Sequence, residues 1–288
     1  MNGILIVDKP ADWTSHDVVA KLRSSLKIKR IGHGGTLDPM ATGVLPVFIG
    51  RATRAVEFCE NAEKEYIAGL RLGIVTDTQD ITGNTLSECE HSISSDDLVA
   101  VIPRFLGAQK QLPPMYSAIK INGKKLYELA RRGIDVPRPA RDITISSLKL
   151  LGSDDSDYSL QIACSKGTYI RTLCHDIGAC LGCGGTMSSL RRIKAGAFTI
   201  EAAHTLSDIL DSISIGDIGK YLIPVDSIFS EYPSVTLNED EARRCRNGTP
   251  RCPANLPDGT YRFYGADNEF LMLGEVVGCE VKIIKGFY

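Results

Sequence analysis

The chain has 288 residues, a formal net charge of −2, 43% apolar residues and a mean hydropathy of −0.04. These values are ordinary for a globular protein that buries a sizeable core, as one large domain or as one large and one small domain. No apolar run approaches the roughly 20 residues of a membrane-spanning helix, and the N-terminus lacks the basic start and long apolar run of a signal peptide, so we expect a cytosolic protein without membrane contact.

The first predicted elements are a strand and a helix. Residues 3–7 form an apolar run that ends at the sequence DKP, which predicts a short strand. Thr14 or Ser15 then begins a helix, because a side-chain oxygen at that position can accept from free backbone N–H groups. Apolar residues at helical spacing follow and predict one buried face: Val18, Val19, Leu22 and Leu26.

A glycine-rich loop, GHGGTLDPMATG, precedes a second apolar strand, VLPVFIG. The segments after it mix helices and strands without regular alternation, which favours an α+β fold with a mixed, mostly antiparallel sheet flanked by helices. In chain order they are a short helix over 51–60, a strand over 64–73, a polar and turn-rich stretch over 74–95, a helix from Ser94 to about Leu106, a turn at Asn122-Gly123, a helix over 124–132, strands over 143–152 and 158–165 joined by the turn SDDSD, a helix over 168–182, a strand or loop near 186–200 and a mostly helical stretch to about 222.

The sequence changes character from about Pro233 onward. A short helix, EDEARRCRNG, ends at Gly248, and three strand-like runs follow: TYRFYG, FLMLGEVV and EVKIIKG. We therefore predict a large domain over residues 1–232 and a small β-rich domain over residues 233–288.

The nine cysteines predict no disulfide framework. An odd number of cysteines in a cytosolic chain indicates reduced residues of the core. Cys180 and Cys183 have the C-x-x-C spacing, with Cys174 and His175 nearby, but no second pair completes a zinc site. We expect the segment CLGCGG to be a helix end made of small residues, without a metal.

The charges are unevenly distributed along the chain. Residues 20–30 carry five basic and no acidic groups, residues 118–149 carry eight basic against three acidic groups, and residues 76–97 carry six acidic and no basic groups. This separation fits an ordinary solvated surface. It also fits a basic face that follows a polyanion such as RNA, with the acidic part turned away.

The glycine-rich loop has two interpretations from its residues alone. It lacks the G-K-[ST] of a P-loop and the G-x-G-x-x-G of a dinucleotide fold. In the first interpretation it is a tight connection, in which glycines provide positive φ and Asp38 caps a turn before Pro39. In the second, Asp38 projects into a cleft as a nucleophile, and the glycines let a ligand come close.

The full string GHGGTLDPMATGVLPV resembles the active-site motif of the TruB family of tRNA pseudouridine synthases. Further matches follow in the family's order over nearly all of residues 3–200, and the C-terminal part resembles the family's small PUA-like domain. The matching segments are VDKPADWTSHDVV with Lys9, KEYIAGLRLGIVTDTQD with Tyr66, the RNA-gripping insertion QLPPMYSAIKINGKKLYELARRG, KGTYIRTLCHDIG with Arg171, and SSLRR with Leu190.

This resemblance implies that Asp38 is the catalytic aspartate of a uridine isomerase. Such an enzyme breaks the N-glycosidic bond, turns the uracil and rejoins it through C5, so it needs no metal or organic cofactor. Three roles for the carboxylate stay open: attack on the sugar C1′, attack on the uracil C6, or abstraction of a ribose proton.

The resemblance also implies roles for three side chains around Asp38. Arg171 keeps the carboxylate ionised and oriented through a charge-assisted pair. Tyr66 stacks on the flipped uracil near the proton lost from C5, and Leu190 packs under the base. The alternatives are an ordinary surface arginine for Arg171 and plain core positions for Tyr66 and Leu190.

Three further residues are assigned to substrate binding by the resemblance. The target base must leave its stack to reach Asp38, and His33 then occupies the vacated space. Asp80 matches a polar position near the site. Lys9 contacts a phosphate or simply ends its strand.

The basic excess suggests how RNA is held. An insertion over about residues 108–142 places four cations on a turn and helix that close over RNA, and we expect this segment to be mobile without RNA. These cations are Lys124, Lys125, Arg131 and Arg132. A further phosphate track is predicted over Arg191, Arg192 and Lys194, and the acceptor stem is a candidate partner of Arg243, Arg244 and Arg246.

By resemblance the substrate is uridine 55 in the T-arm of tRNA, and we expect a monomer with no obligatory protein partner. Three alternatives remain. One is the guide-RNA-dependent branch of the same superfamily, and another is an RNA-binding helper of tRNA folding with secondary or lost catalysis. The third is a small-molecule glycosidase, which needs a second carboxylate about 5 to 10 Å from Asp38.

Overall fold

The computed structural model describes residues 1–121, 123–154, 157–253 and 256–288. The first residue of the predicted turn at Asn122-Gly123 and the centre of the predicted turn SDDSD, residues 155–156, lie outside these ranges. None of the described helices is long and apolar enough to cross a membrane.

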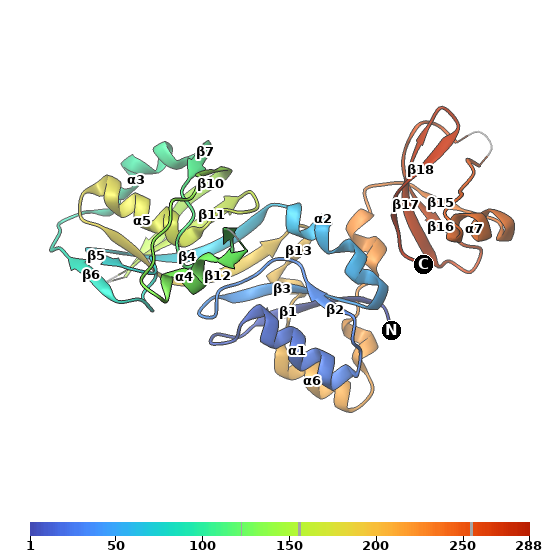
Figure 1. Cartoon of the computed structure of the whole chain (residues 1–288), viewed down its shortest axis with the longest axis horizontal. Coiled ribbons are helices and arrows are strands. Elements are labelled where there is room, and N and C mark those ends of the chain that lie inside the picture. The colour runs from blue at the N-terminus through green and yellow to red at the C-terminus, as the bar shows by residue number, and fades with distance from the viewer. Residues whose placement is uncertain (122, 155–156, 254–255) are drawn as a thin grey trace.

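A large mixed sheet forms the centre of the molecule (Figure 1). Its strand order is β14-β1-β3-β12-β4-β11-β10-β7, with β2 paired to β3 and β13 paired to β12. Most neighbours are antiparallel, and the parallel pairs are β1 with β14 and β12 with β3. This confirms the predicted α+β fold. The strands are β1 (Gly3–Lys9), β2 (Ile31–His33), β3 (Thr42–Ile49), β4 (Lys64–Leu72), β7 (Gly107–Gln111), β10 (Arg141–Ser153), β11 (Tyr158–Cys164), β12 (Gly185–Ala195), β13 (Phe198–Thr199) and β14 (His204–Thr205).

Helices cover this sheet through their apolar faces. Helix α1 begins after Thr14, whose side chain accepts from the Asp17 backbone N–H, as the sequence predicted. Its buried residues pack with α6 against β1 and β3, whereas α5 and α3 pack together over the other half of the sheet. The helices are α1 (Ser15–Leu26), α2 (Val56–Asn61), α3 (Ser95–Val101), α5 (Ile170–Leu181) and α6 (Leu206–Ser214), with 3₁₀ segments at Gly50–Ala55, Ile102–Phe105, Ile200–Ala202, Ile218–Tyr221 and Val225–Phe229.

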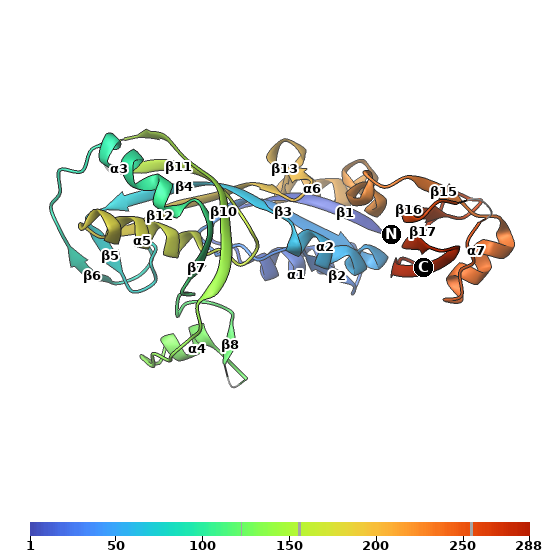
Figure 2. The same cartoon turned by 90° about the horizontal axis from the view of Figure 1, so that it is seen from above.

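An arm, residues 112–140, leaves the sheet at the end of β7 and returns at the start of β10. Figure 2 shows it projecting away from the sheet. It contains β8 (Lys120–Ile121), β9 (Lys124–Lys125) and α4 (Leu126–Ala130). The helix is shorter than the predicted span of 124–132, because Lys124 and Lys125 pair with β8 instead.

The polar stretch over 74–95 contains a hairpin that its turn-rich sequence did not predict. Strands β5 (Ile74–Thr76) and β6 (Thr85–Glu88) pair antiparallel. Strand β6 is fully exposed, so it has no apolar alternation from which it could have been recognised.

A smaller sheet follows at the C-terminal end, in the order β15-β16-β17-β18, with its own buried cluster (Figure 1). This is the separate β-rich unit that the sequence predicted, although the boundary between residues 232 and 233 stays a prediction. The parallel edge strand β15 was not predicted, because it has only three residues. The elements are β15 (Ser234–Thr236), α7 (Glu239–Arg246), β16 (Gly259–Tyr264), β17 (Phe270–Val277) and β18 (Glu280–Gly286).

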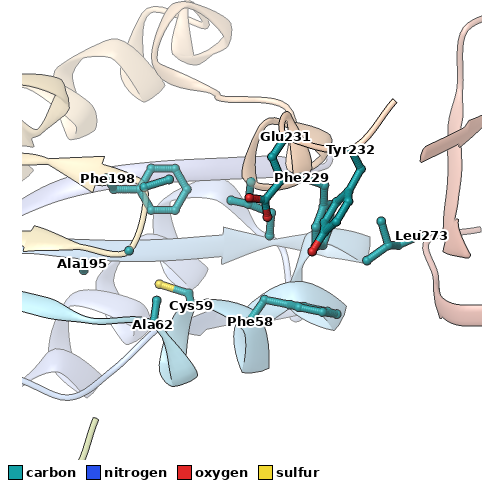
Figure 3. A pocket seen from close by; sticks show the side chains of 12 residues that line it. Phe58, Cys59, Ala62, Ala195, Phe198, Phe229, Glu231, Tyr232 and Leu273 are labelled. Carbon is teal, nitrogen blue, oxygen red and sulfur yellow. The ribbon is translucent and has the colours of Figure 1, made fainter. Parts of the chain in front are cut away.

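A cavity of about 240 Å³ lies at the end of the large part that faces the small sheet, which contributes Leu273 to its wall (Figure 3). The described residues that line it are mostly apolar and do not include Asp38 or Arg171. Phe229 packs edge-on against Phe58, with ring centroids 4.9 Å apart, and also contacts Phe287 of the C-terminal segment. The cavity therefore belongs to the packing that joins the small sheet to the large one.

Candidate active site

A second cavity, of about 300 Å³, brings together the four residues on which the sequence interpretation depended. Asp38 comes from the loop between β2 and β3, Tyr66 from β4, Arg171 from α5 and Leu190 from β12. The start of the arm completes the wall with residues 116–118. Residues far apart in the chain therefore meet where the glycine-rich loop faces the middle of the sheet.

Asp38 and Arg171 form a two-point ion pair. The distance from Arg171 Nε to Asp38 Oδ2 is 3.0 Å, and Nη2 lies 3.4 Å from Oδ1. A planar guanidinium matches the two oxygens of a carboxylate in this way, which fixes orientation as well as position. The Asp38 carboxylate is thus held in one orientation relative to the guanidinium, at the edge of the cavity.

The guanidinium of Arg171 is itself held by other groups. It donates to the backbone oxygens of Thr78, at 3.1 Å, and Tyr116, at 2.9 Å. Asp80 Oδ2 lies 3.7 Å from Nη1, so the cation lies between two carboxylates. Because every edge of the guanidinium has a partner, Arg171 has little freedom to follow Asp38 if the loop moves.

Asp80 supports the position of Arg171 and is itself held by hydrogen bonds. Its Oδ1 accepts from the Thr78 hydroxyl at 2.8 Å, from the Thr82 backbone N–H at 3.0 Å and from the Thr82 hydroxyl at 2.5 Å. The side chain is buried. Asp80 is therefore a partner of Arg171, and its bonded carboxylate is a poor candidate for the second catalytic group of a glycosidase.

Lys9 anchors the loop from inside the protein. Its ammonium donates to the backbone oxygens of Pro10, at 2.8 Å, Pro39, at 3.1 Å, and Trp13. The residue is completely buried, and burial lowers the pKa of its ammonium to about 8. Of the two alternatives for Lys9, contact with an RNA phosphate does not fit this structure, because the ammonium is enclosed by main-chain oxygens, one of which is that of Pro39, directly after Asp38.

Arg192 is a second internal anchor. It is 1% exposed and donates to the backbone oxygens of Val44, at 2.7 Å, and Gly35, at 3.0 Å. Its predicted place in a surface phosphate track is therefore wrong. The alternation of strand β12 was the available signal, because it places Arg192 on the same face as Leu190. Its neighbours Arg191 and Lys194 are more exposed and pair with Asp8 and Glu65.

The floor of the cavity comes from β4 and β12. Tyr66 and Leu190 are buried there, and burial raises the pKa of the Tyr66 phenol, which therefore stays neutral at physiological pH. Lys64, two residues before Tyr66 on the same face, also lines the cavity. Its ammonium donates to main-chain oxygens of Cys59, Glu60 and Ala62. The sequence interpretation missed Lys64, which strand alternation from Tyr66 could have identified.

Two groups of predicted binding residues lie outside the cavity. His33, at the end of β2, is half-buried, and burial lowers its pKa; its Nδ1 has no hydrogen-bond partner among the described residues. The arm cations Lys124, Lys125, Arg131 and Arg132 lie farther along the chain, and those of Lys125 and Arg131 lie 5.3 and 5.5 Å from the centre of the Tyr127 ring. The described residues of the cavity wall include none of these five.

The chemistry available here is that of a carboxylate, a fixed guanidinium and a neutral phenol. Cys180 is exposed and Cys183 is buried. Within the described ranges, no group of three or more His, Cys, Asp or Glu side chains is placed to hold a metal ion.

Comparison with known proteins places this site in context. The profile of the TruB family pseudouridylate synthase N-terminal domain matches residues 23–170, and that of the tRNA pseudouridylate synthase B C-terminal domain matches residues 171–230. Proteins named tRNA pseudouridine synthase B are 42% identical over all of both chains in Clostridium kluyveri, and 44% identical over 95% of both chains in Clostridium novyi.

Solved structures are similar over 99% of this chain and 85% of theirs. One is a Cbf5-Nop10-Gar1 complex, with a TM-score of 0.75 and 28% identity. Another is an H/ACA RNP bound to a substrate RNA containing 2'-deoxyuridine, with a TM-score of 0.74 and 26% identity.

Proposed function

The chain belongs to the TruB family of pseudouridine synthases, and from this premise we propose that it converts uridine 55 in the T-loop of tRNA to pseudouridine. The full-length relatives named tRNA pseudouridine synthase B support the substrate. The observation that carries the assignment is the two-point pair of Asp38 with Arg171 at the edge of a cavity that also contains Tyr66 and Leu190.

Asp38 is the group that acts on the flipped nucleotide. Its carboxylate lines the cavity, and Gly35 in the preceding loop lines it too, which leaves space there for close approach of RNA. Arg171 orients the carboxylate and stabilises its negative charge while the glycosidic bond breaks. Lys9 and Asp80 contribute indirectly, because one holds the backbone after Asp38 and the other holds Arg171.

Tyr66 and Leu190 receive the uracil ring. Leu190 offers an apolar surface under the base, and Tyr66 offers an aromatic ring on which a pyrimidine can stack. Because burial raises the pKa of the phenol, Tyr66 remains a neutral group near C5 rather than a competing anion beside Asp38.

The arm and the loop around His33 bind the tRNA. The cations of the arm contact phosphates and draw the T-arm onto the cavity. His33 fills the space that the flipped base leaves in the RNA. The enzyme acts in the cytoplasm, as a single chain without an obligatory protein partner and without a cofactor.

Release of tritium from tRNA labelled at uracil C5 tests this function directly. We expect the wild type to release tritium, and Asp38→Ala to release none while it still binds tRNA with near wild-type affinity. Absence of release by folded wild-type protein on any tRNA would instead favour a folding helper. Release only after addition of a guide RNA and partner proteins would favour the guide-dependent branch.

A further inference from the structure

Two contacts tie the base of the arm, residues 111–116, to residues 169–171, the short segment that carries Arg171. One is made by the side chain of Gln111, the last residue of β7, and the other by the guanidinium of Arg171. From them we infer that Gln111 is a positioning residue, which couples the RNA-binding arm to the ion pair of Arg171 with Asp38. This inference rests on the proposed function for its role in catalysis, but the contacts themselves do not depend on it.

The first contact is a pair of hydrogen bonds to the main chain of Tyr169. Gln111 Nε2 donates to the Tyr169 backbone oxygen at 3.0 Å, and the Tyr169 backbone N–H donates to Gln111 Oε1 at 2.8 Å. Gln111 as a whole residue is 4% exposed. A buried amide that satisfies both groups of one residue fixes that residue as a neighbouring strand does.

Tyr169 is a sensitive place for such a contact. It immediately precedes α5 and lies two residues before Arg171. Among the described residues, no side chain caps the N-terminus of α5 by a hydrogen bond. The main-chain contact with Gln111 therefore sets where the first turn of α5 begins, and with it the direction in which Arg171 leaves the helix.

The second contact lies five residues farther along the chain. Arg171 Nη2 donates to the backbone oxygen of Tyr116, in the arm, at 2.9 Å. The connecting sequence, Leu112-Pro113-Pro114-Met115, is stiff, because proline fixes its own φ and restricts the residue before it. The segment 111–116 is thus held against residues 169–171 at its first residue, Gln111, and at its last, Tyr116.

The returning end of the arm reinforces this connection. Gln111 and Arg141 are paired residues of β7 and β10, so the arm leaves and rejoins the sheet at one point. Arg138, just before that point, donates to the Pro113 backbone oxygen at 2.6 Å. RNA that displaces the arm would therefore move the Tyr116 carbonyl away from Arg171. Gln111 opposes this movement, because it holds the base of the arm against Tyr169, two residues before Arg171.

Loss of Gln111 is expected to affect the chemical step more than tRNA binding. The arm cations remain in place, so phosphate contacts persist. The N-terminus of α5, however, loses the hydrogen bonds that fix it, and with them the fixed position from which the Arg171 guanidinium reaches Asp38. We expect the single-turnover rate of pseudouridine formation by Gln111→Ala to fall about tenfold or more, which corresponds to the loss of buried hydrogen bonds, with a change below about threefold in the Kd for tRNA.

Two further variants sharpen the experiment. Gln111→Glu keeps an acceptor for the Tyr169 N–H but places a buried carboxylate oxygen against the Tyr169 carbonyl, so its rate is expected to fall at least as far as that of Gln111→Ala. Gln109→Ala is the matched control, since Gln109 lies on the same strand and, within the described part of the chain, its amide donates locally, to the Phe105 backbone oxygen. Its rate is expected to equal that of the wild type.

Hydrogen exchange of the free protein gives a readout that needs no activity. In Gln111→Ala, amides of residues 169–173 and 115–118 are expected to exchange faster together, and in Gln109→Ala they are not. If Gln111→Ala shows this faster exchange but the wild-type protein makes no pseudouridine, the proposed function is overturned and the structural coupling stands.

Three results would overturn the inference itself. One is unchanged exchange at residues 169–173 in folded Gln111→Ala. Another is a weakened tRNA affinity with an unchanged single-turnover rate. The third is an equal loss of rate in Gln109→Ala, which would indicate general damage to the edge of the sheet.

Discussion

The side chain of Arg171 is 6% exposed, whereas that of Asp38, which it contacts at 3.0 Å, is 36% exposed. The pair is therefore asymmetric: the cation is part of the protein interior, and the carboxylate borders the cavity. Both side chains line the cavity, but the carboxylate is the more accessible of the two to a ligand that enters it. This relationship makes the guanidinium a fixed group against which the Asp38 carboxylate is aligned.

Replacement of Arg171 by lysine is expected to lower the single-turnover rate about 100-fold or more. An ammonium cannot make the two-point contact with Asp38 and also serve the carbonyls of Thr78 and Tyr116, so buried acceptors lose their donors. Pseudouridine formation on saturating tRNA measures the effect. Arg191→Lys, which alters an exposed pair with Asp8, serves as the control. A rate for Arg171→Lys within threefold of the wild type would contradict the geometry.

Lys9 is expected to make the stability of the protein depend on alkaline pH. Burial lowers its pKa from 10.5 to about 8, so between these values the unfolded chain holds the proton that the folded protein has released. The free energy of unfolding then rises with pH across this window. Relative to Lys9→Met, the wild type should gain on the order of 1 to 3 kcal/mol between pH 7.5 and pH 10. Urea unfolding measures this difference, and a constant difference over the same range would refute it.

His33 is expected to contribute to destabilisation in acid. Burial lowers its pKa in the folded protein, so as the pH falls below its usual value of 6.5 the unfolded chain takes up the proton first. The stability contributed by neutral His33 is therefore complete near neutral pH and is lost as the pH falls through this window. Urea unfolding at pH 7 and pH 5 should show a smaller loss for His33→Gln than for the wild type. Equal losses would mean that the imidazole is not constrained by burial.

Gly43 is expected to tolerate no side chain. Its φ is +101°, and a Cβ atom there would lie 2.2 Å from the backbone oxygen of Arg192, in the parallel pairing of β3 with β12. Gly43→Ala should lower the free energy of unfolding by about 3 kcal/mol or more, or prevent folding. Thermal unfolding measures the loss. Gly219→Ala, at a position with open space and no positive φ, should change stability little, and equal effects of the two changes would contradict this reasoning.

The sequence predicted the architecture and that Asp38, Tyr66, Arg171 and Leu190 share one site, because motif resemblance and strand periodicity can be recognised from the sequence alone. It failed where the partner of a charge had to be known. Lys9 and Arg192 look like RNA-binding cations in a sequence, yet both donate to main-chain carbonyls that only the fold brings near. The register of the arm against Tyr169 was equally hidden, since it joins residues 58 positions apart.

The sequence also could not find the shortest elements. Strands β6 and β15 have four and three residues and lie at sheet edges. So few residues carry no periodic signal, and their pairing partners determine them. The roles of His33 and the arm cations stay predictions, because they depend on an RNA that the cavity wall alone does not specify.

The buried cations around the loop give the protein two electrostatic systems with different sensitivities. Lys9, Lys64 and Arg192 are buried and bonded to main-chain oxygens, and although Lys64 and Arg192 also line the cavity, dissolved ions screen all three less than exposed charges. The arm cations Lys124 and Arg131 face solvent, where the screening length is about 8 Å at physiological ionic strength. In the proposed function, added salt is therefore expected to weaken the binding of the arm to RNA more than it changes the field of the buried cations at Asp38.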